Sequence, residues 1–138
     1  MSESNCVSLE YDFLKALHFH ELKNGLRVIQ KIWLPRNDSF FIIELSSKKE
    51  IETVFELAVN MRLMHENMHE RKYAVREGKR LVVESDLGKL IVSVLKGKAF
   101  FQRKPEYRVH FPGSEQQCFF VPGVFRLSGK RIVLLLSA

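Results

Sequence analysis

The sequence predicts an α+β fold in which a mostly antiparallel meander of strands packs on one long amphipathic helix. Three observations predict it. An Asn-Gly pair separates two apolar runs near the N-terminus, apolar residues recur at helical spacing over residues 48–69, and short β-like runs bounded by Gly or Pro fill the chain after residue 72. With 138 residues and 46% apolar composition, the chain has the size of a single domain spanning residues 1–138.

The N-terminal part is predicted to hold three strands. Residues 14–22 and 26–34 flank Lys23-Asn24-Gly25, and Asn-Gly supplies the positive φ angles that a tight hairpin requires. The Pro-Arg-Asn-Asp sequence at 35–38 is typical of a second turn. Residues 39–45 contain a β-branched and aromatic run that is too short for a buried helix, so they are expected to form the third strand.

The helix is expected over residues 48–69. Ser46 and Ser47 can cap its N-terminus, and Glu50 and Glu52 fall in its first turn, where carboxylates are favoured. The apolar positions that recur at helical spacing are Ile51, Val54, Phe55, Leu57, Ala58, Met61, Met64 and Met68. In this interpretation the helix braces one face of the sheet.

The rest of the chain is predicted to form short strands joined by turns. The β-like runs cover residues 73–76, 80–84, 90–95, 99–102, 107–111, 118–121 and 132–137. Between them lie Glu-Gly at 77–78, Asp-Leu-Gly at 86–88, a glycine at 97, and Pro-Gly at 112–113 and 122–123. Each of these favours a turn through its backbone preferences.

Charge is distributed unevenly along the chain. Residues 1–69 carry 8 Lys/Arg and 10 Asp/Glu, a balance of −2, whereas residues 70–138 carry 14 and 6, a balance of +8. The acidic-leaning half and the basic half together give the formal net charge of +6. A basic half of this kind indicates an anionic partner, with nucleic acid favoured and an acidic protein as the alternative.

Cations and aromatic rings interleave in the basic half, between residues 96 and 111. Proteins that bind single-stranded nucleic acids require both, because cations follow the phosphates while aromatic rings stack on splayed bases. The predicted phosphate contacts are Arg76, Lys79, Arg80, Lys96, Lys98, Arg103, Lys104 and Arg108, and the predicted stacking residues are Phe101 and Tyr107. The alternative is an ordinary strand whose rings face the core and whose cations face solvent.

A second pattern, His65-Glu66-Asn67-Met68-His69, has the spacing of the HExxH motif and resembles the zinc peptidases that carry it. Two histidines at i and i+4 on a helix can share a metal, and the glutamate between them can act as general base. This resemblance implies a metal-dependent hydrolase with zinc held by His65 and His69. The competing interpretation is that these histidines pack toward the sheet, with no metal and no cofactor, in a protein that is not an enzyme.

The remaining features concern location and association. The longest apolar runs are far shorter than the ~20 residues that a membrane-spanning helix needs, and the N-terminus lacks a secretory signal pattern, so a cytoplasmic protein without a membrane span is expected. Cys6 and Cys118 have no metal-ligand spacing. A third function, an adaptor or inhibitor that binds an acidic protein, stays open. So does a homodimer formed through an unpaired sheet edge at 39–45 or 132–137.

Overall fold

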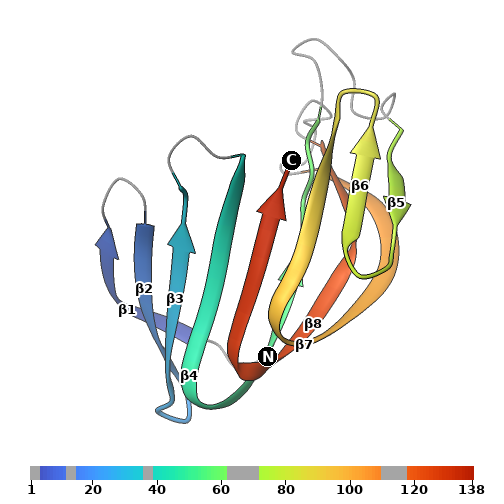
Figure 1. Ribbon diagram of the computed structural model, residues 1–138. Helices are drawn as coiled ribbons and strands as arrows, with labels where there is room; N and C mark the ends of the chain where they lie inside the picture. Colours follow the sequence, from blue (N-terminus) through green and yellow to red (C-terminus); the bar gives the residue numbers. More distant parts are fainter. Residues whose placement is uncertain (1–3, 12–14, 36–38, 62–71, 110–117) are drawn as a thin grey trace.

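The computed structural model describes residues 4–11, 15–35, 39–61, 72–109 and 118–138, and these form one antiparallel sheet of eight strands (Figure 1). The order of strands across the sheet is β1-β2-β3-β4-β8-β7-β6-β5. Their bounds are β1 Ser4–Tyr11, β2 Lys15–Leu22, β3 Arg27–Trp33, β4 Phe40–Glu56, β5 Ala74–Arg76, β6 Leu81–Ser85, β7 Gly88–Val109 and β8 Cys118–Ser137.

The predicted α+β fold is wrong, because the described residues contain strands and no helix. The helix expected over residues 48–69 is replaced in its first part by β4, which continues from Phe40 to Glu56. Its last part, residues 62–69, lies outside the described residues. The antiparallel character of the sheet was predicted. Within the described ranges, no helix is long and apolar enough to cross a membrane.

The apolar pattern of this segment fits two periods, and the structure selects the shorter one. Ile51 and Leu57 are buried, and Phe55 between them packs against the same core, so alternate residues face inward as they do on a strand. Hydrogen bonding to β8 over residues 51–56 decides the outcome, because a neighbouring strand satisfies the backbone groups that a helix would satisfy internally. The β-branched residues here also favour the strand.

The predicted turns are mostly confirmed, whereas several of the predicted short strands are parts of longer ones. The hairpin at Asn24-Gly25 is confirmed: β2 pairs with β3, and Gly25 has φ +79°. The β5–β6 hairpin and the turn before Gly88 are also confirmed. The runs at 90–95, 99–102 and 107–109 instead belong to one strand, β7, and those at 118–121 and 132–137 both belong to β8. Residues 110–111 lie outside the described residues.

The three long strands β4, β8 and β7 share one bend. Where β4 pairs with β8, the register shifts between Ser46 and Ile51, so that residues 47–50 span the interval that Lys130 alone spans on β8. Where β7 pairs with β8, the register shifts again between Lys96 and Lys98. Such bulges bend a strand. Because they lie side by side on three neighbouring strands, β4, β8 and β7 fold over together at this line, at the lower end of Figure 1.

Gly97 is required at the bend for two reasons. Its φ is +95°, which residues with a side chain rarely adopt. A Cβ there would also lie 3.1 Å from the carbonyl oxygen of Ser128 and 3.2 Å from the side chain of buried Ile132. The glycine that the sequence marked as a turn therefore allows β7 to bend against β8 without ending.

The core lies between the two halves of the folded sheet. One cluster joins residues from the first half of β8, among them Phe120, Phe125 and Leu127, to Ile132 and Leu134 from its second half. The ring of Phe125 sits between two neighbouring strands, with centroids 4.8 Å from Phe101 on β7 and 6.2 Å from Phe55 on β4. The two layers therefore hold each other through the side chains of one central strand.

Tyr73 closes the core beside β5. Its ring stacks on Phe120 at 4.6 Å with nearly parallel planes. Its hydroxyl accepts a hydrogen bond from the Met61 N–H at 3.0 Å and is placed to donate to the Met61 carbonyl oxygen at 3.2 Å. One side chain thus fixes the backbone that follows β4 onto the core.

Tyr73→Phe keeps the stacked ring and removes these hydrogen bonds. We expect the free energy of unfolding to fall by about 1–2 kcal/mol, because the polar groups at Met61 lose a partner. Urea denaturation followed by circular dichroism measures the change. Leu87→Ala, which truncates an exposed side chain, serves as the control and should stay within about 0.5 kcal/mol of the parent protein. Equal stability of Tyr73→Phe and the control would contradict the assignment.

Candidate nucleic-acid interface

One end of the folded sheet carries an unusual number of cations, and we call this surface the basic rim. It consists of the β2–β3 turn (residues 23–27), the bends of β4 (46–51), β8 (129–131) and β7 (96–98), and the β5–β6 turn (77–80). The first four segments lie at the lower end of Figure 1, and the β5–β6 turn lies above the bend of β7. Its cationic residues, all exposed, are Lys23, Arg27, Lys48, Lys49, Lys79, Arg80, Lys96, Lys98, Lys130 and Arg131.

Strand pairing makes these segments neighbours in space. Val28 pairs with Ser47, which joins the β2–β3 turn to the β4 bend. Ser46 pairs with Arg131, which joins β4 to β8. On the other side of β8, its residues 128 and 133 pair with Lys98 and Lys96 of β7. The β5–β6 turn then lies over β7, where residues 77–81 line a small cavity together with Val94, Ala99 and Phe101.

The rim is strongly positive. Its five described segments hold the ten cations named above and two acidic residues, Glu50 and Glu77. Four of the cations, at 23, 27, 48 and 49, come from the half of the sequence that is acidic overall. The surface is therefore a product of the fold, and charge counted along the chain does not reveal it.

Two arginines at or beside the rim are paired with carboxylates. Arg131 Nε lies 2.7 Å from Glu44 Oε1 on the neighbouring strand β4. Arg76, at the end of β5, forms an ion pair across the hairpin with Glu84, with its Nη2 atom 2.7 Å from Glu84 Oε2. Both pairs are exposed, and such pairs contribute little to stability. Among the ion pairs of the described ranges, none includes Lys79, Arg80, Lys96, Lys98 or Lys130.

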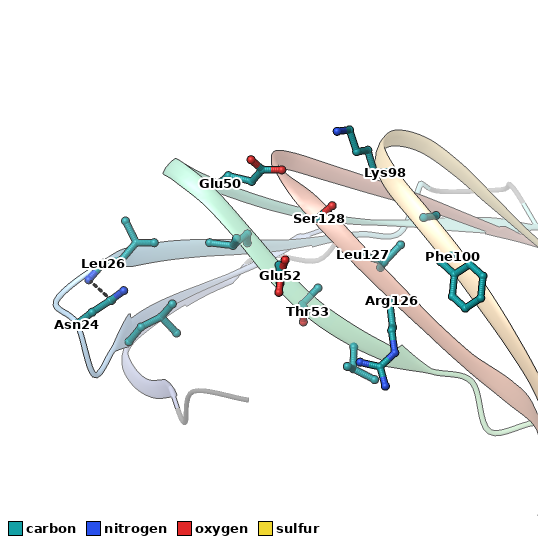
Figure 2. Close-up of a pocket in the computed structure, with 14 residues that line it drawn as sticks. Asn24, Leu26, Glu50, Glu52, Thr53, Lys98, Phe100, Arg126, Leu127 and Ser128 are labelled. Carbon is teal, nitrogen blue, oxygen red and sulfur yellow. Dashed lines mark hydrogen bonds between the residues drawn. The ribbon is translucent and has the colours of Figure 1, made fainter.

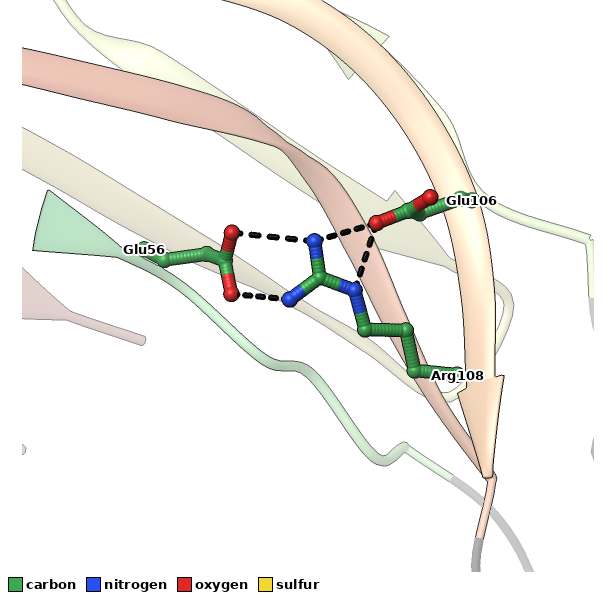
Figure 3. A network of polar contacts seen from close by, with 3 residues as sticks. All are labelled: Glu56, Glu106 and Arg108. Carbon is green, nitrogen blue, oxygen red and sulfur yellow. Dashed lines mark hydrogen bonds and ion pairs between the residues drawn. The ribbon is translucent and has the colours of Figure 1, made fainter. Parts of the chain in front are cut away.

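Arg108 has a different environment, shown in Figure 3. Its guanidinium bridges Glu56 on β4 and Glu106 on its own strand β7, and one of the bonds to Glu56, from Nη2, measures 3.0 Å. Hydrogen bonds to Glu56 and then Glu106 raise the pKa of Arg108 above its ordinary value. With two carboxylates on one guanidinium, this cluster carries no net positive charge for a phosphate, and it ties β7 to β4.

The predicted phosphate-contacting residues therefore fall into two groups. Lys79, Arg80, Lys96 and Lys98 belong to the basic rim, and Arg76 lies at its border. Arg103 and Lys104 lie further along β7, beside the register shift opposite Gly123. At about 3.3 Å per residue, Arg103 is roughly 17 Å from Lys98 along the strand. The structure thus brings half of the predicted set together with cations that the sequence did not suggest.

The predicted stacking residues also differ in position. Phe101 is half-buried and packs on Phe125 in the core. Tyr107 is 40% exposed, and its ring contacts Phe120 at 5.3 Å and Tyr73 at 6.5 Å. The next ring along, Phe100, is 63% exposed, the largest value among the large apolar residues described. Alternation along β7 places it on the face opposite Phe101.

A groove of about 710 Å³ lies on that opposite face, beside the rim (Figure 2). The bent strands β4, β8 and β7 form its floor, and residues of the β2–β3 hairpin form one end. Its polar and aromatic lining comprises Asn24, Glu50, Glu52, Thr53, Lys98, Phe100, Arg126 and Ser128. The carboxylates come from β4, and the cations come from β8 and β7.

Sequence reasoning missed the rim residues of β4 and β8 and the groove residues Phe100 and Arg126. A signal for the rim is present in the sequence: Lys48-Lys49, Lys79-Arg80, Lys96-Gly-Lys98 and Lys130-Arg131 are four basic pairs, and each lies at a bend or turn. The pair at 48–49 was read as the start of a helix. The pair at 130–131 lay between two strands predicted as separate.

The HExxH-like residues His65, Glu66 and His69 lie outside the described residues. Within the described part of the chain, no group of three or more His, Cys, Asp or Glu side chains is placed to hold a metal ion. A further histidine pair, His18 and His20 on β2, has ring centroids 6.0 Å apart. The hydrolase hypothesis therefore gains no support from the described residues.

No protein family matches this chain. No curated protein and no solved structure is significantly similar to it. The functional argument accordingly rests on the geometry and charge of the surface described above.

Proposed function

We propose that this protein binds nucleic acid through the basic rim, as a non-enzymatic module of the cytoplasm. The observation that carries the proposal is the convergence of ten cations from five chain segments, which hold two acidic residues themselves; one of the ten, Arg131, is paired with Glu44 of β4. Nucleic acids are lined with regularly spaced phosphates, and a continuous row of lysines and arginines is the surface that such a backbone requires.

The shape of the rim supports the same partner. It follows the fold line of the sheet across β4, β8 and β7 and ends in a hairpin turn on either side (Figure 1). An extended ridge of this kind suits a linear polyanion better than a compact anionic ligand. An acidic protein remains the alternative partner. A homodimer through a sheet edge would not use 42–45 or 133–137, which are paired on both sides. The edges of the described sheet are β1, β5 and the second halves of β4 and β7, which pair with β8 alone.

The salt dependence of binding tests the proposal. We expect fluorescence anisotropy of a labelled oligonucleotide to show affinity falling linearly with salt on logarithmic axes, because each phosphate contact releases counterions. Six contacts would weaken binding roughly 10³-fold between 50 and 200 mM salt. Protein purified at low salt should also carry nucleic acid, visible as a raised 260/280 absorbance ratio that a high-salt wash removes.

Absence of binding at 50 mM salt, or an affinity that does not change with salt, would contradict the proposal. Co-purification of a stoichiometric acidic protein with a normal absorbance ratio would instead favour the adaptor interpretation. Both outcomes are read from the same purified protein.

A further inference from the structure

The groove beside the rim combines an exposed aromatic ring with segregated charge. Phe100 on β7 and Arg126 on β8 are Cα partners, and Val54 on β4 completes the row. Paired residues on antiparallel strands project to the same face, so the ring and the guanidinium lie next to each other. Figure 2 shows both side chains on the same side of the ribbon.

The adjacent row leads to the rim. It consists of Glu52 on β4, Ser128 on β8 and Lys98 on β7, and Lys98 is itself a rim residue. Phe100 lies two residues beyond Lys98 on the same face of β7, and Arg126 is its partner on β8. A nucleic-acid strand that follows the rim past Lys98 therefore reaches both side chains next. The cations lie on β7 and β8, and the carboxylates Glu50 and Glu52 lie on β4, on the other side of β8 from β7.

We infer that this groove holds one unpaired nucleobase, stacked on Phe100, of a single strand whose phosphates contact Lys98 and Arg126. The inference rests on the proposed function and assigns it a substrate class, namely single strands in preference to duplexes. A flat ring with an accessible face stacks on any base. A paired base in a duplex has both faces covered by its neighbours and must first be extruded at a cost in free energy.

The charge pattern orients the ligand. Glu50 and Glu52 on β4 repel phosphates, whereas Arg126 on β8 and Lys98 on β7 attract them, so the backbone follows the side of the groove formed by β8 and β7. A groove lined by cations alone would attract a phosphate backbone across its whole floor, whereas the carboxylates of β4 confine the backbone to β8 and β7, next to Phe100.

The experiment compares Phe100→Ala with the parent protein on two probes, a fluorescein-labelled DNA single strand of about 16 nucleotides and the duplex with its complement. The parent protein should bind the single strand more tightly. Phe100→Ala should weaken single-strand binding at least about fivefold, the loss expected for one stacked base, and leave duplex affinity unchanged. Phe100→Trp should retain the single-strand preference.

Leu95→Ala is the matched control, because it removes another exposed apolar side chain of β7, 55% accessible. It should change neither affinity. Equal affinities of Phe100→Ala and the parent protein for the single strand would overturn the groove assignment, and so would equal losses on both probes. In either case salt-dependent binding by the parent protein would leave the proposed function standing. Failure of the parent protein to bind either probe would overturn the proposed function itself.

Discussion

Removing three rim lysines, in Lys79→Gln/Lys96→Gln/Lys130→Gln, is expected to weaken binding of a DNA single strand roughly 10²- to 10³-fold at 0.1 M salt. The three residues come from the β5–β6 turn, β7 and β8, and all are exposed. The logarithmic salt slope should fall by about 2.7, because three phosphate contacts no longer release counterions. Anisotropy titrations at several salt concentrations measure both quantities.

The matched control is Lys72→Gln/Arg103→Gln/Lys104→Gln, which removes three exposed cations away from the rim. Each triple variant lowers the formal net charge from +6 to +3, so a general effect of charge would act on both equally. We expect the control to lose less than about tenfold, because its residues meet no phosphate and alter only the long-range field. A larger loss in the control than in the rim variant would place the interface at the control residues, of which Arg103 and Lys104 are among the phosphate contacts predicted from the sequence.

Substituting the buried Gly123 is expected to give the largest loss of stability. A Cβ at Gly123 would lie 2.2 Å from the carbonyl oxygen of Gln102, 2.8 Å from the Phe101 ring and 3.0 Å from the Lys104 amide nitrogen. Two of these three atoms belong to the backbone of β7, which cannot move without disturbing its pairing with β8. We expect Gly123→Ala to lower the free energy of unfolding by about 3 kcal/mol or more, measured by urea or thermal denaturation.

Gly78→Ala is the control for Gly123. Nothing lies within 4 Å of a Cβ at Gly78, in the exposed β5–β6 turn. That substitution should be neutral or stabilise by up to about 1 kcal/mol, because the unfolded chain loses freedom. Similar stabilities for the two variants would show that β7 and β8 do not approach each other as described at Gln102.

The sequence predicted the hairpin at Asn24-Gly25 because its cause is local. Asn-Gly adopts positive φ angles with little strain, and the flanking apolar runs are long enough to pair. The β5–β6 hairpin was also predictable from a local signal, the Glu77-Gly78 pair between two β-like runs. In both cases the residues that determine the structure lie within a few positions of each other.

The helix was predicted wrongly because its apolar residues satisfy two periods at once. Ile51, Phe55 and Leu57 fit an alternating pattern, and Val54 and Ala58 add the helical one. The choice between helix and strand depended on β8, about 70 residues further along the chain, because β8 forms the backbone hydrogen bonds that hold β4 as a strand. No feature within residues 48–56 records that pairing.

The candidate site was predictable in its chemistry and only partly in its position. The interleaving of cations and rings after residue 96 indicated nucleic acid, and Lys96 and Lys98 do lie on the rim. The same reasoning chose Phe101, whose ring packs in the core, over its neighbour Phe100. It also counted Arg108, whose charge two carboxylates compensate. Strand register decides which of two adjacent residues faces outward, and a shift of one residue exchanges the two faces. The sequence did not determine that register.

The amino-acid sequence by itself determined where the backbone can turn or bend, as at Gly25 and Gly97, and supplied basic pairs at those points. Whether a glycine ends a strand or bends it was decided by the tertiary structure, as was the meeting of ten cations on one rim. The physical reason is range. Backbone preferences act between residues close in the chain, whereas the aligned bulges of β4, β8 and β7 exist only once hydrogen bonds join segments that are far apart in sequence.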